Sequence, residues 1–210
     1  MGQTLEIGQA PSSYYESNFL SRRWRRGLAS MLKELLPVGW ESARLLDVGV
    51  GDGYTIRLVK PEGPVFGIDI DPAMKELAIA KGVDFRSGSA YNIPFPDATF
   101  DIVTCVEVVE HLERPGDALK ELRRVLNLGG SVVLTTPVPS ASWRIIWWAW
   151  TKFGPGKRWE TSPHVSELSL SGAGGQHDLS QMLKELGFDI ELTASCNFGL
   201  VSGARATRKN

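Results

Sequence analysis

The sequence predicts an α/β protein whose doubly wound sheet has seven strands, most of them parallel. Three observations support this fold class. Short β-rich runs alternate with amphipathic helical runs from residue 44 onward, which is typical of right-handed crossovers in a parallel sheet. The β-rich runs are apolar on both faces, like strands that helices cover from both sides. The first run ends in a turn with three glycines, which lets the chain bend sharply into a helix.

The individual elements follow from periodicity and from turn residues. An amphipathic helix is expected over 13–36, and Pro37 ends it. Five strands are expected over 44–48, 65–69, 83–86, 101–106 and 131–136. Helices are expected between them over 52–59, 72–81 and 117–126. A last helix over 179–186 precedes two further β-rich runs at 189–193 and 198–205.

Length and composition indicate a single domain over residues 1–210. The chain is long enough to bury a sizeable core, and 42% hydrophobic with 22% charged residues is ordinary for a globular protein. The formal net charge of −1 gives no overall attraction to nucleic acid, so no such partner is expected. Cys105 and Cys196 lack metal-type spacing, and neither a signal peptide nor an apolar run of about 20 residues is evident. A cytoplasmic location is therefore expected.

Two segments fall outside the alternating pattern. The helical cap over 13–36 contains the basic cluster Arg22, Arg23, Arg25 and Arg26, which is expected to be a solvated helix face. The insert over 137–175 contains the aromatic run Trp143–Trp150, which is too short to span a bilayer. This run suits a lid over an apolar substrate or an interfacial helix. The alternative is a place in the core or at a dimer face, so both a monomer and a homodimer stay open.

The glycine-rich turn predicts a cofactor site. Gly49, Gly51 and Gly53 form G-x-G-x-G, and Tyr54 stands where a dinucleotide fingerprint has its third glycine. Asp47 precedes the turn and suits a cationic amine better than a pyrophosphate. Asp69 ends the second strand, 20 residues after Gly49, which is the usual offset for a carboxylate that binds ribose hydroxyls. The next residue, Ile70, is suited to lie against an adenine face.

Four segments resemble, in order, the motifs of class I S-adenosylmethionine (SAM)-dependent methyltransferases. They are LLDVGVGDG, VFGIDIDPAMKELA, GSAYNIPFPDATFDIV and ALKELRRVLNLGGSVVLTTP. The resemblance covers about residues 40–136 and, more loosely, extends to Phe188. It implies a Rossmann-like sheet and SAM as the cofactor.

The resemblance also implies which residues contact the cofactor. Asp47 and the glycine turn would bind its amino-acid part, Asp69 its ribose, and Ile70 its adenine face, with further contacts at the adenine edge and at the end of the fourth strand. The complete set is Asp47, Gly49, Gly51, Gly53, Asp69, Ile70, Ser89, Ala90 and Cys105. Ser89 stands where the family usually has an acid. The run 127–130 (Asn-Leu-Gly-Gly) replaces the usual Lys-Pro-Gly-Gly.

The segment CVEVVEHLERPGDALKEL more closely resembles the O-methyltransferases of ubiquinone biosynthesis. That group implies a role in activity or in divalent-metal binding for Glu107, Glu110 and His111. His111 is the candidate general base, because it follows the fourth strand beside the expected methyl group. Glu-x-x-Glu-His also offers oxygen ligands suited to Mg²⁺. No metal is expected, however, because many metal-free methyltransferases have similar acids that shape this loop.

The expected function is transfer of a methyl group from SAM to a small or lipid-like acceptor, at oxygen. Peripheral membrane contact through Trp143–Trp150 would fit a lipid-like acceptor. Two alternatives stay open: a non-catalytic SAM-binding or scaffold protein, and a nicotinamide-dependent oxidoreductase. Tyr54 and the lack of a second catalytic domain disfavour the oxidoreductase.

Overall fold

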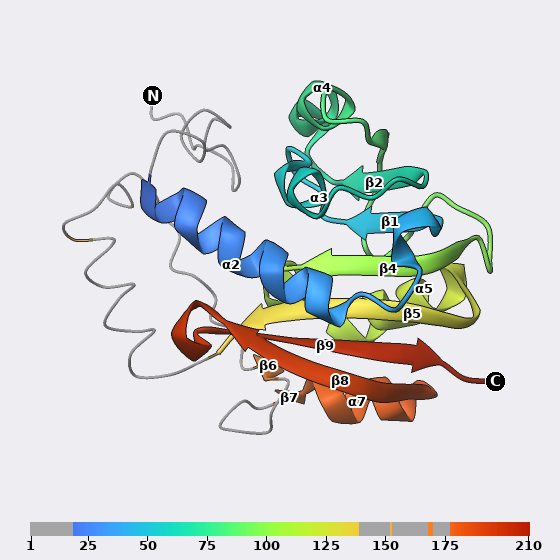
Figure 1. Cartoon of the computed structure of the whole chain (residues 1–210). Coiled ribbons are helices and arrows are strands. Elements are labelled where there is room, and N and C mark those ends of the chain that lie inside the picture. The colour runs from blue at the N-terminus through green and yellow to red at the C-terminus, as the bar shows by residue number, and fades with distance from the viewer. Residues whose placement is uncertain (1–18, 139–151, 153–167, 170–176) are drawn as a thin grey trace, which may run out of the picture.

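The computed structural model describes residues 19–138, 152, 168–169 and 177–210 (Figure 1). Seven strands form one sheet in the order β3-β2-β1-β4-β5-β9-β8. Pairs from β3 to β5 are parallel, and β9 runs antiparallel to both β5 and β8. The strands are β1 (Leu45–Val48), β2 (Val65–Asp69), β3 (Asp84–Ser87), β4 (Phe100–Val106), β5 (Leu126–Pro137), β8 (Phe188–Cys196) and β9 (Val201–Arg208). The predicted mostly parallel, seven-stranded sheet is confirmed.

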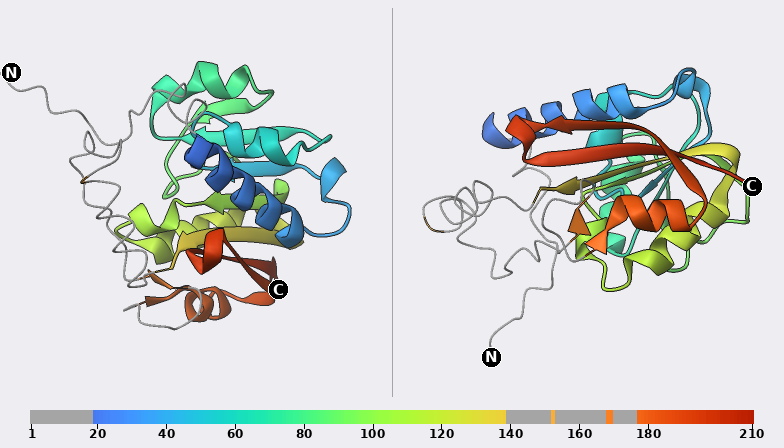
Figure 2. Two further views of the ribbon diagram at one scale, coloured as in Figure 1. Left: turned by 60° about the vertical axis from the view of Figure 1, so that its left-hand side comes forward. Right: turned by 90° about the horizontal axis from the view of Figure 1, so that it is seen from below.

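Helices cover both faces of this sheet (Figure 2). One apolar core contains side chains of α5 (Pro115–Val125) and α7 (Leu179–Glu185). The core on the other face contains side chains of α2 (Phe19–Leu35), α3 (Tyr54–Val59) and α4 (Lys75–Ile79). Short 3-10 turns are η1 (Trp40–Ser42), η2 (Pro72–Met74), η3 (Val109–His111) and η5 (Asn197–Gly199). A separate parallel pair joins β6 (Leu168–Ser169) to β7 (His177–Asp178).

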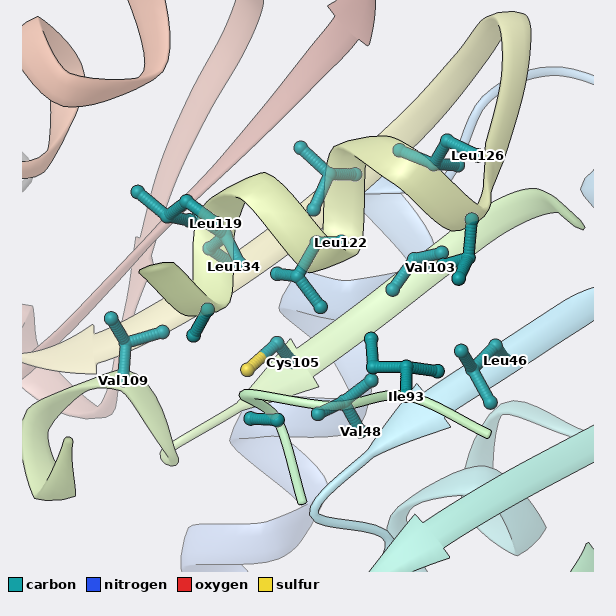
Figure 3. Close-up of a cluster of buried hydrophobic side chains, with 14 of the residues drawn as sticks. Leu46, Val48, Ile93, Val103, Cys105, Val109, Leu119, Leu122, Leu126 and Leu134 are labelled. Atoms are coloured by element: carbon teal, nitrogen blue, oxygen red, sulfur yellow. The ribbon is translucent and has the colours of Figure 1, made fainter. Parts of the chain in front are cut away.

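Helix α5 shows how the sequence fixes one of these faces. Pro115 starts the helix, where a missing N–H costs nothing. The buried side chains of α5 repeat at helical spacing and form one apolar stripe; they are Ala118, Leu119, Leu122 and Val125. Figure 3 shows Leu119 and Leu122 facing Val103 and Cys105 of β4. This packing fixes β4, whose carboxyl end leads into the segment with Glu107 and His111.

Several element boundaries differ from the predicted ones, and three of these differences change the reading of an element. Strand β5 begins at Leu126 rather than at 131, because Leu126 already pairs with Phe100 across an irregularity in β4. Strand β9 begins at Val201 rather than at 198, because residues 197–199 have left-handed backbone conformations with φ of 52°, 62° and 76°. The helix expected over 72–81 is divided into η2 and α4.

The helical cap and the insert are described only in part. Helix α2 covers 19–35 of the helix expected over 13–36, and residues 13–18 lie outside the described residues. The aromatic run at 143–150 also lies outside them. Among the residues that are described, no helix is long and apolar enough to cross a membrane.

Candidate functional site

Asp47 is buried near the carboxyl end of β1, with only 3% of its surface exposed. The Thr104 hydroxyl of β4 donates a hydrogen bond of 2.6 Å to Asp47 Oδ1. Burial raises the pKa of Asp47 to about 7, although the Thr104 hydrogen bond opposes this rise. The negative charge of Asp69 raises the pKa further. A cationic group beside Asp47 would therefore favour its ionised form.

The glycine turn after β1 has two different structural requirements. Gly49 and Gly51 have φ of 75° and 51°, in the left-handed region that favours glycine. A Cβ on Gly49 would lie 2.3 Å from Val108 Cγ2, so this glycine lets the segment after β4 pack on the turn. A Cβ on Gly51 would meet nothing within 4 Å, so the turn faces open space there. Gly53, with φ of 72°, precedes α3 and packs against Ala78.

Asp69 connects the glycine turn to the end of β2. Its Oδ2 accepts a hydrogen bond of 2.9 Å from the Gly51 N–H, and its Oδ1 accepts one of 2.9 Å from the Asp71 N–H. Asp69 does not cap η2. The cap is Asp71, whose Oδ1 accepts a hydrogen bond of 2.9 Å from the Ala73 N–H. Ile70 is 78% exposed. A carboxylate and an exposed apolar side chain therefore lie side by side at the end of β2.

The three remaining candidate cofactor residues have different surroundings. Ser89 is half-buried, and its hydroxyl accepts a hydrogen bond of 3.2 Å from the Tyr91 N–H. Ala90 is buried in the apolar core beneath α5. Cys105 is 1% exposed, and its thiol lies in the same core (Figure 3), where burial raises its pKa well above the ordinary value. The side chains of Ala90 and Cys105 thus pack within the protein rather than at its surface.

The three residues expected to act on the acceptor are divided between interior and surface. Glu107 has φ of 53°, and its N–H donates to Thr135 Oγ1 at 3.0 Å. Burial raises the pKa of Glu107 to about 7. A hydrogen bond from the Trp24 side chain and the positive charge of Arg25 oppose this rise. Burial also raises the pKa of Glu110 to about 8, and the charge of Glu107 adds to this rise. His111 is exposed.

No group of three or more His, Cys, Asp or Glu side chains suited to a metal is found within 19–138 and the other described ranges. Glu110 Oε2 is buried and has no hydrogen-bond partner among the described residues. Glu107 and Glu110 are thus two carboxyls of raised pKa at the end of β4, the first half-buried and the second buried.

Helix α2 supplies contacts to the glycine turn that the sequence analysis missed. Arg25 Nη1 lies 3.6 Å from Asp52 Oδ1, and the Arg25 guanidinium is 4.4 Å from the centroid of the Tyr54 ring. Lys81 approaches the same carboxylate at 3.6 Å and donates to the Asp52 carbonyl at 2.9 Å. Trp24 reaches Glu107 at the end of β4. One face of α2 therefore contacts both segments that form the site.

The expectation of a solvated basic face is correct for three of the four arginines. Arg22, Arg23 and Arg26 are exposed, whereas the Arg25 side chain is only 17% exposed. Arg25 precedes the buried Leu28 and Leu32 by three and seven residues, which places it on the buried stripe of the helix. This helical spacing was the signal in the sequence that could have identified Arg25.

Comparison with known proteins identifies the domain. Residues 46–134 match a family model described as a methyltransferase domain. The match runs from β1 to β5 and includes Asp47, the glycine turn, Asp69 and the segment after β4. Residues 46–134 therefore form a methyltransferase domain of the SAM-dependent class, and SAM is the cofactor that this domain implies. This confirms the predicted family and the predicted cofactor.

Individual relatives agree with this assignment. A "Probable S-adenosylmethionine-dependent methyltransferase" of Mycolicibacterium smegmatis is 32% identical over 71% of this chain and 53% of its own length. A demethylmenaquinone methyltransferase of Deinococcus radiodurans is 35% identical over 59% of this chain and 53% of its own length. The chain spans about half the length of these curated relatives. A solved SAM-dependent methyltransferase of Thermotoga maritima has the same fold, with a TM-score of 0.69, 22% identity, and coverage of 94% of this chain and 96% of the other.

Proposed function

We propose that this chain transfers a methyl group from SAM to the oxygen of a small or lipid-like acceptor. The observation that carries the proposal is the edge where β1 and β2 end. A buried acid, the open side of a glycine turn, a second carboxylate and an exposed apolar side chain lie there on adjacent strands. These groups match the amine, the amino-acid backbone, the ribose and the adenine of SAM, in that order.

The assignment of each group follows from its chemistry. When bound, SAM supplies an electrophilic methyl group on a sulfonium. Asp47 would pair with the cationic amine, which offsets the unfavourable burial of its charge. The N–H groups of Gly49 and Gly51 already donate within the protein, so their carbonyl oxygens would accept from the amine. Asp69 would accept from ribose hydroxyls through its remaining lone pairs, and Ile70 would cover the adenine.

The less exposed candidates would act differently. Ser89 would contact the adenine edge through its hydroxyl or backbone. Ala90 and Cys105 have side chains packed in the α5 core, so only their backbone atoms would line the cofactor. Gly53 would set the direction in which α3 leaves the turn.

Removal of a proton from the acceptor would be the task of His111. Its imidazole is exposed and follows the end of β4, so it is accessible to an incoming hydroxyl group. General-base assistance of this kind contributes about 10²–10⁴ to a rate. Glu107 and Glu110 would line the acceptor side as carboxyls of raised pKa. A metal bound by Glu107, Glu110 and His111 is the less favoured alternative.

The acceptor is proposed to be apolar. Relatives of this chain include an enzyme named for a quinone, demethylmenaquinone. The tryptophan-rich run 143–150, which lies outside the described residues, would add apolar surface near such an acceptor. The chain is proposed to act as a monomer or homodimer in the cytoplasm.

Methyl transfer is the direct test. The chain is incubated with methyl-labelled SAM and a panel of phenols and hydroquinones with and without an isoprenoid tail. Labelled product from a tailed hydroquinone, with less from the untailed one, is expected. Binding of SAM without transfer to any acceptor would favour the non-catalytic scaffold.

A further inference from the structure

A basic groove lies between the first half of α2 and the turn η5. It has a volume of about 620 Å³ and is lined by Arg22, Arg23, Arg26, Gly27, Asn197 and Phe198. Among the residues that the structure describes, the lining thus has three guanidinium groups, which stay charged at any relevant pH, and no acidic residue. The whole chain has a formal net charge of −1, so this positive charge is a local feature.

Phe198 projects from this groove at an energetic cost. Its side chain is 90% exposed, so the ring gains almost nothing from burial in the core. Its backbone is left-handed, with φ of 62° and ψ of 33°, which is unfavourable for a bulky residue. Folding alone gives no reason for an exposed, strained aromatic residue at this position.

The turn that carries Phe198 is fixed to α2. Asn197 Nδ2 donates to the Trp24 carbonyl at 3.2 Å. Gly27 permits this approach, because a Cβ on it would lie 2.2 Å from Asn197 Oδ1. The Arg23 guanidinium is 5.9 Å from the centroid of the Phe198 ring. The arginines and the phenylalanine therefore belong to one surface.

This surface lies at the same edge of the sheet as the candidate site. Val201, which follows η5, pairs with Pro137 at the carboxyl end of β5. On the other side of β5, the Glu107 N–H donates to Thr135. Figure 1 shows the β8–β9 turn and the start of α2 at the edge where β4 and β5 end. A partner bound to the groove would therefore lie close to the opening of the site.

We propose that this groove docks the protein on an anionic phospholipid membrane. The three arginines would pair with lipid phosphates, and Phe198 would insert its ring at the interface, where exposed aromatic side chains are favourable. The strained, exposed turn is then explained by a benefit that arises only at the membrane. The docking itself is independent of the proposed function, although its benefit to the enzyme rests on a lipid-like acceptor.

Vesicle binding tests the proposal without any activity measurement. The full chain is sedimented with vesicles of phosphatidylcholine, with and without phosphatidylglycerol. Binding is expected only with the anionic lipid, and high salt should weaken it. Arg23→Gln should reduce binding about fivefold, and the triple change at Arg22, Arg23 and Arg26 about 100-fold. Arg23→Lys should retain it, because lysine keeps the charge.

Phe198→Gly separates docking from stability. Glycine relieves the positive φ, so the thermal midpoint should stay the same or rise, whereas vesicle binding should fall about tenfold. Matched controls are Lys184→Gln on α7 and Leu128→Ser at the start of β5, where Leu128 is 62% exposed. Both controls should bind vesicles like the unchanged protein.

Three results would overturn the proposal: equal binding to neutral and anionic vesicles, equal loss in the controls, or a large fall in the thermal midpoint of Phe198→Gly. Salt-sensitive binding to RNA that is tighter than binding to vesicles would also contradict the proposal, because the groove would then bind a different polyanion. Loss of vesicle binding with unchanged methylation of a soluble acceptor would leave the proposed function intact. Vesicle binding without any methyl transfer would contradict the proposed function alone.

Discussion

Arg25 lies over the ring of Tyr54, the residue that replaces the third glycine of a dinucleotide-binding turn. Its guanidinium also approaches Asp52 within the turn at 3.6 Å, and its positive charge opposes the rise in the pKa of Glu107. One arginine of α2 thus interacts with the cofactor side and the acceptor side of the candidate site. Tyr54 is both a departure from the dinucleotide pattern and the platform for this contact.

Replacing Arg25 should therefore weaken cofactor binding, although Arg25 would not itself contact the cofactor. Arg25→Gln removes a stacking contact and a partly buried ion pair, so SAM affinity should fall about 3- to 30-fold. Arg25→Lys keeps the charge but not the planar stacking, and should show an intermediate loss. Calorimetry with SAM measures this effect. Arg26→Gln, on the exposed side of the same helix, serves as the control, and an equal affinity in both Gln variants would contradict the role given to Arg25.

His111→Ala should lower turnover by about 10²–10⁴. SAM affinity should stay close to that of the unchanged protein, because the imidazole is exposed and is not part of the cofactor edge. Steady-state kinetics on an acceptor found in the methyl-transfer screen gives the readout, and Glu113→Gln, an exposed neighbour, is the control. Equal turnover in the alanine variant and the unchanged protein would remove His111 from the mechanism. Loss of activity on addition of a chelator would instead favour a metal bound by Glu107, Glu110 and His111.

The raised pKa of Glu110 predicts how stability depends on pH. Burial raises the pKa of Glu110 in the folded protein from its ordinary value of 4.5 to about 8. Below the ordinary pKa of a glutamate, the Glu110 carboxyl is protonated in both the folded and the unfolded state. Its burial therefore does not lower the free energy of unfolding there. As pH rises from about 4.5 to 8, only the unfolded state ionises readily, and the free energy of unfolding falls.

Glu110→Gln should remove the part of this decline that Glu110 causes, whereas Asp47 and Glu107, whose pKa values are also raised, should keep their own parts. The variant should be more stable than the unchanged protein at pH 8, by up to several kcal/mol, and should differ little from it at pH 4. Urea denaturation at a series of pH values measures this, with Glu113→Gln as the exposed control. A variant whose stability declines with pH as steeply as that of the unchanged protein would show that Glu110 is not the cause.

The sequence predicted the sheet because the evidence for it is local. Each parallel strand is a short apolar run, and all four residues of β1 are buried. Glycines at 49, 51 and 53 have the positive φ that such a turn requires. Asp69 also lies at the end of β2, as its spacing from Gly49 suggested.

The contacts of α2 could not be predicted in the same way. Trp24 meets Glu107 across more than 80 residues of sequence, and no local pattern encodes that pairing. The sequence predicts the start of a strand at Phe198, because aromatic residues are common in strands, whereas the structure has a left-handed turn there. Cys105 is buried because its face of β4 packs against α5. The sequence does not indicate which face of β4 meets α5, because the strand has apolar residues on both faces.

Calorimetry with SAM, S-adenosylhomocysteine and NAD on the unchanged protein and on Asp47→Asn tests the proposed site most directly. The unchanged protein should bind SAM and S-adenosylhomocysteine but not NAD. Asp47→Asn should bind SAM about 10- to 100-fold more weakly, because the amine loses its charged partner. Its thermal midpoint should not fall, since asparagine can still accept the Thr104 hydrogen bond without a buried charge. Tight binding of NAD, or an unchanged SAM affinity in Asp47→Asn, would contradict the proposed site.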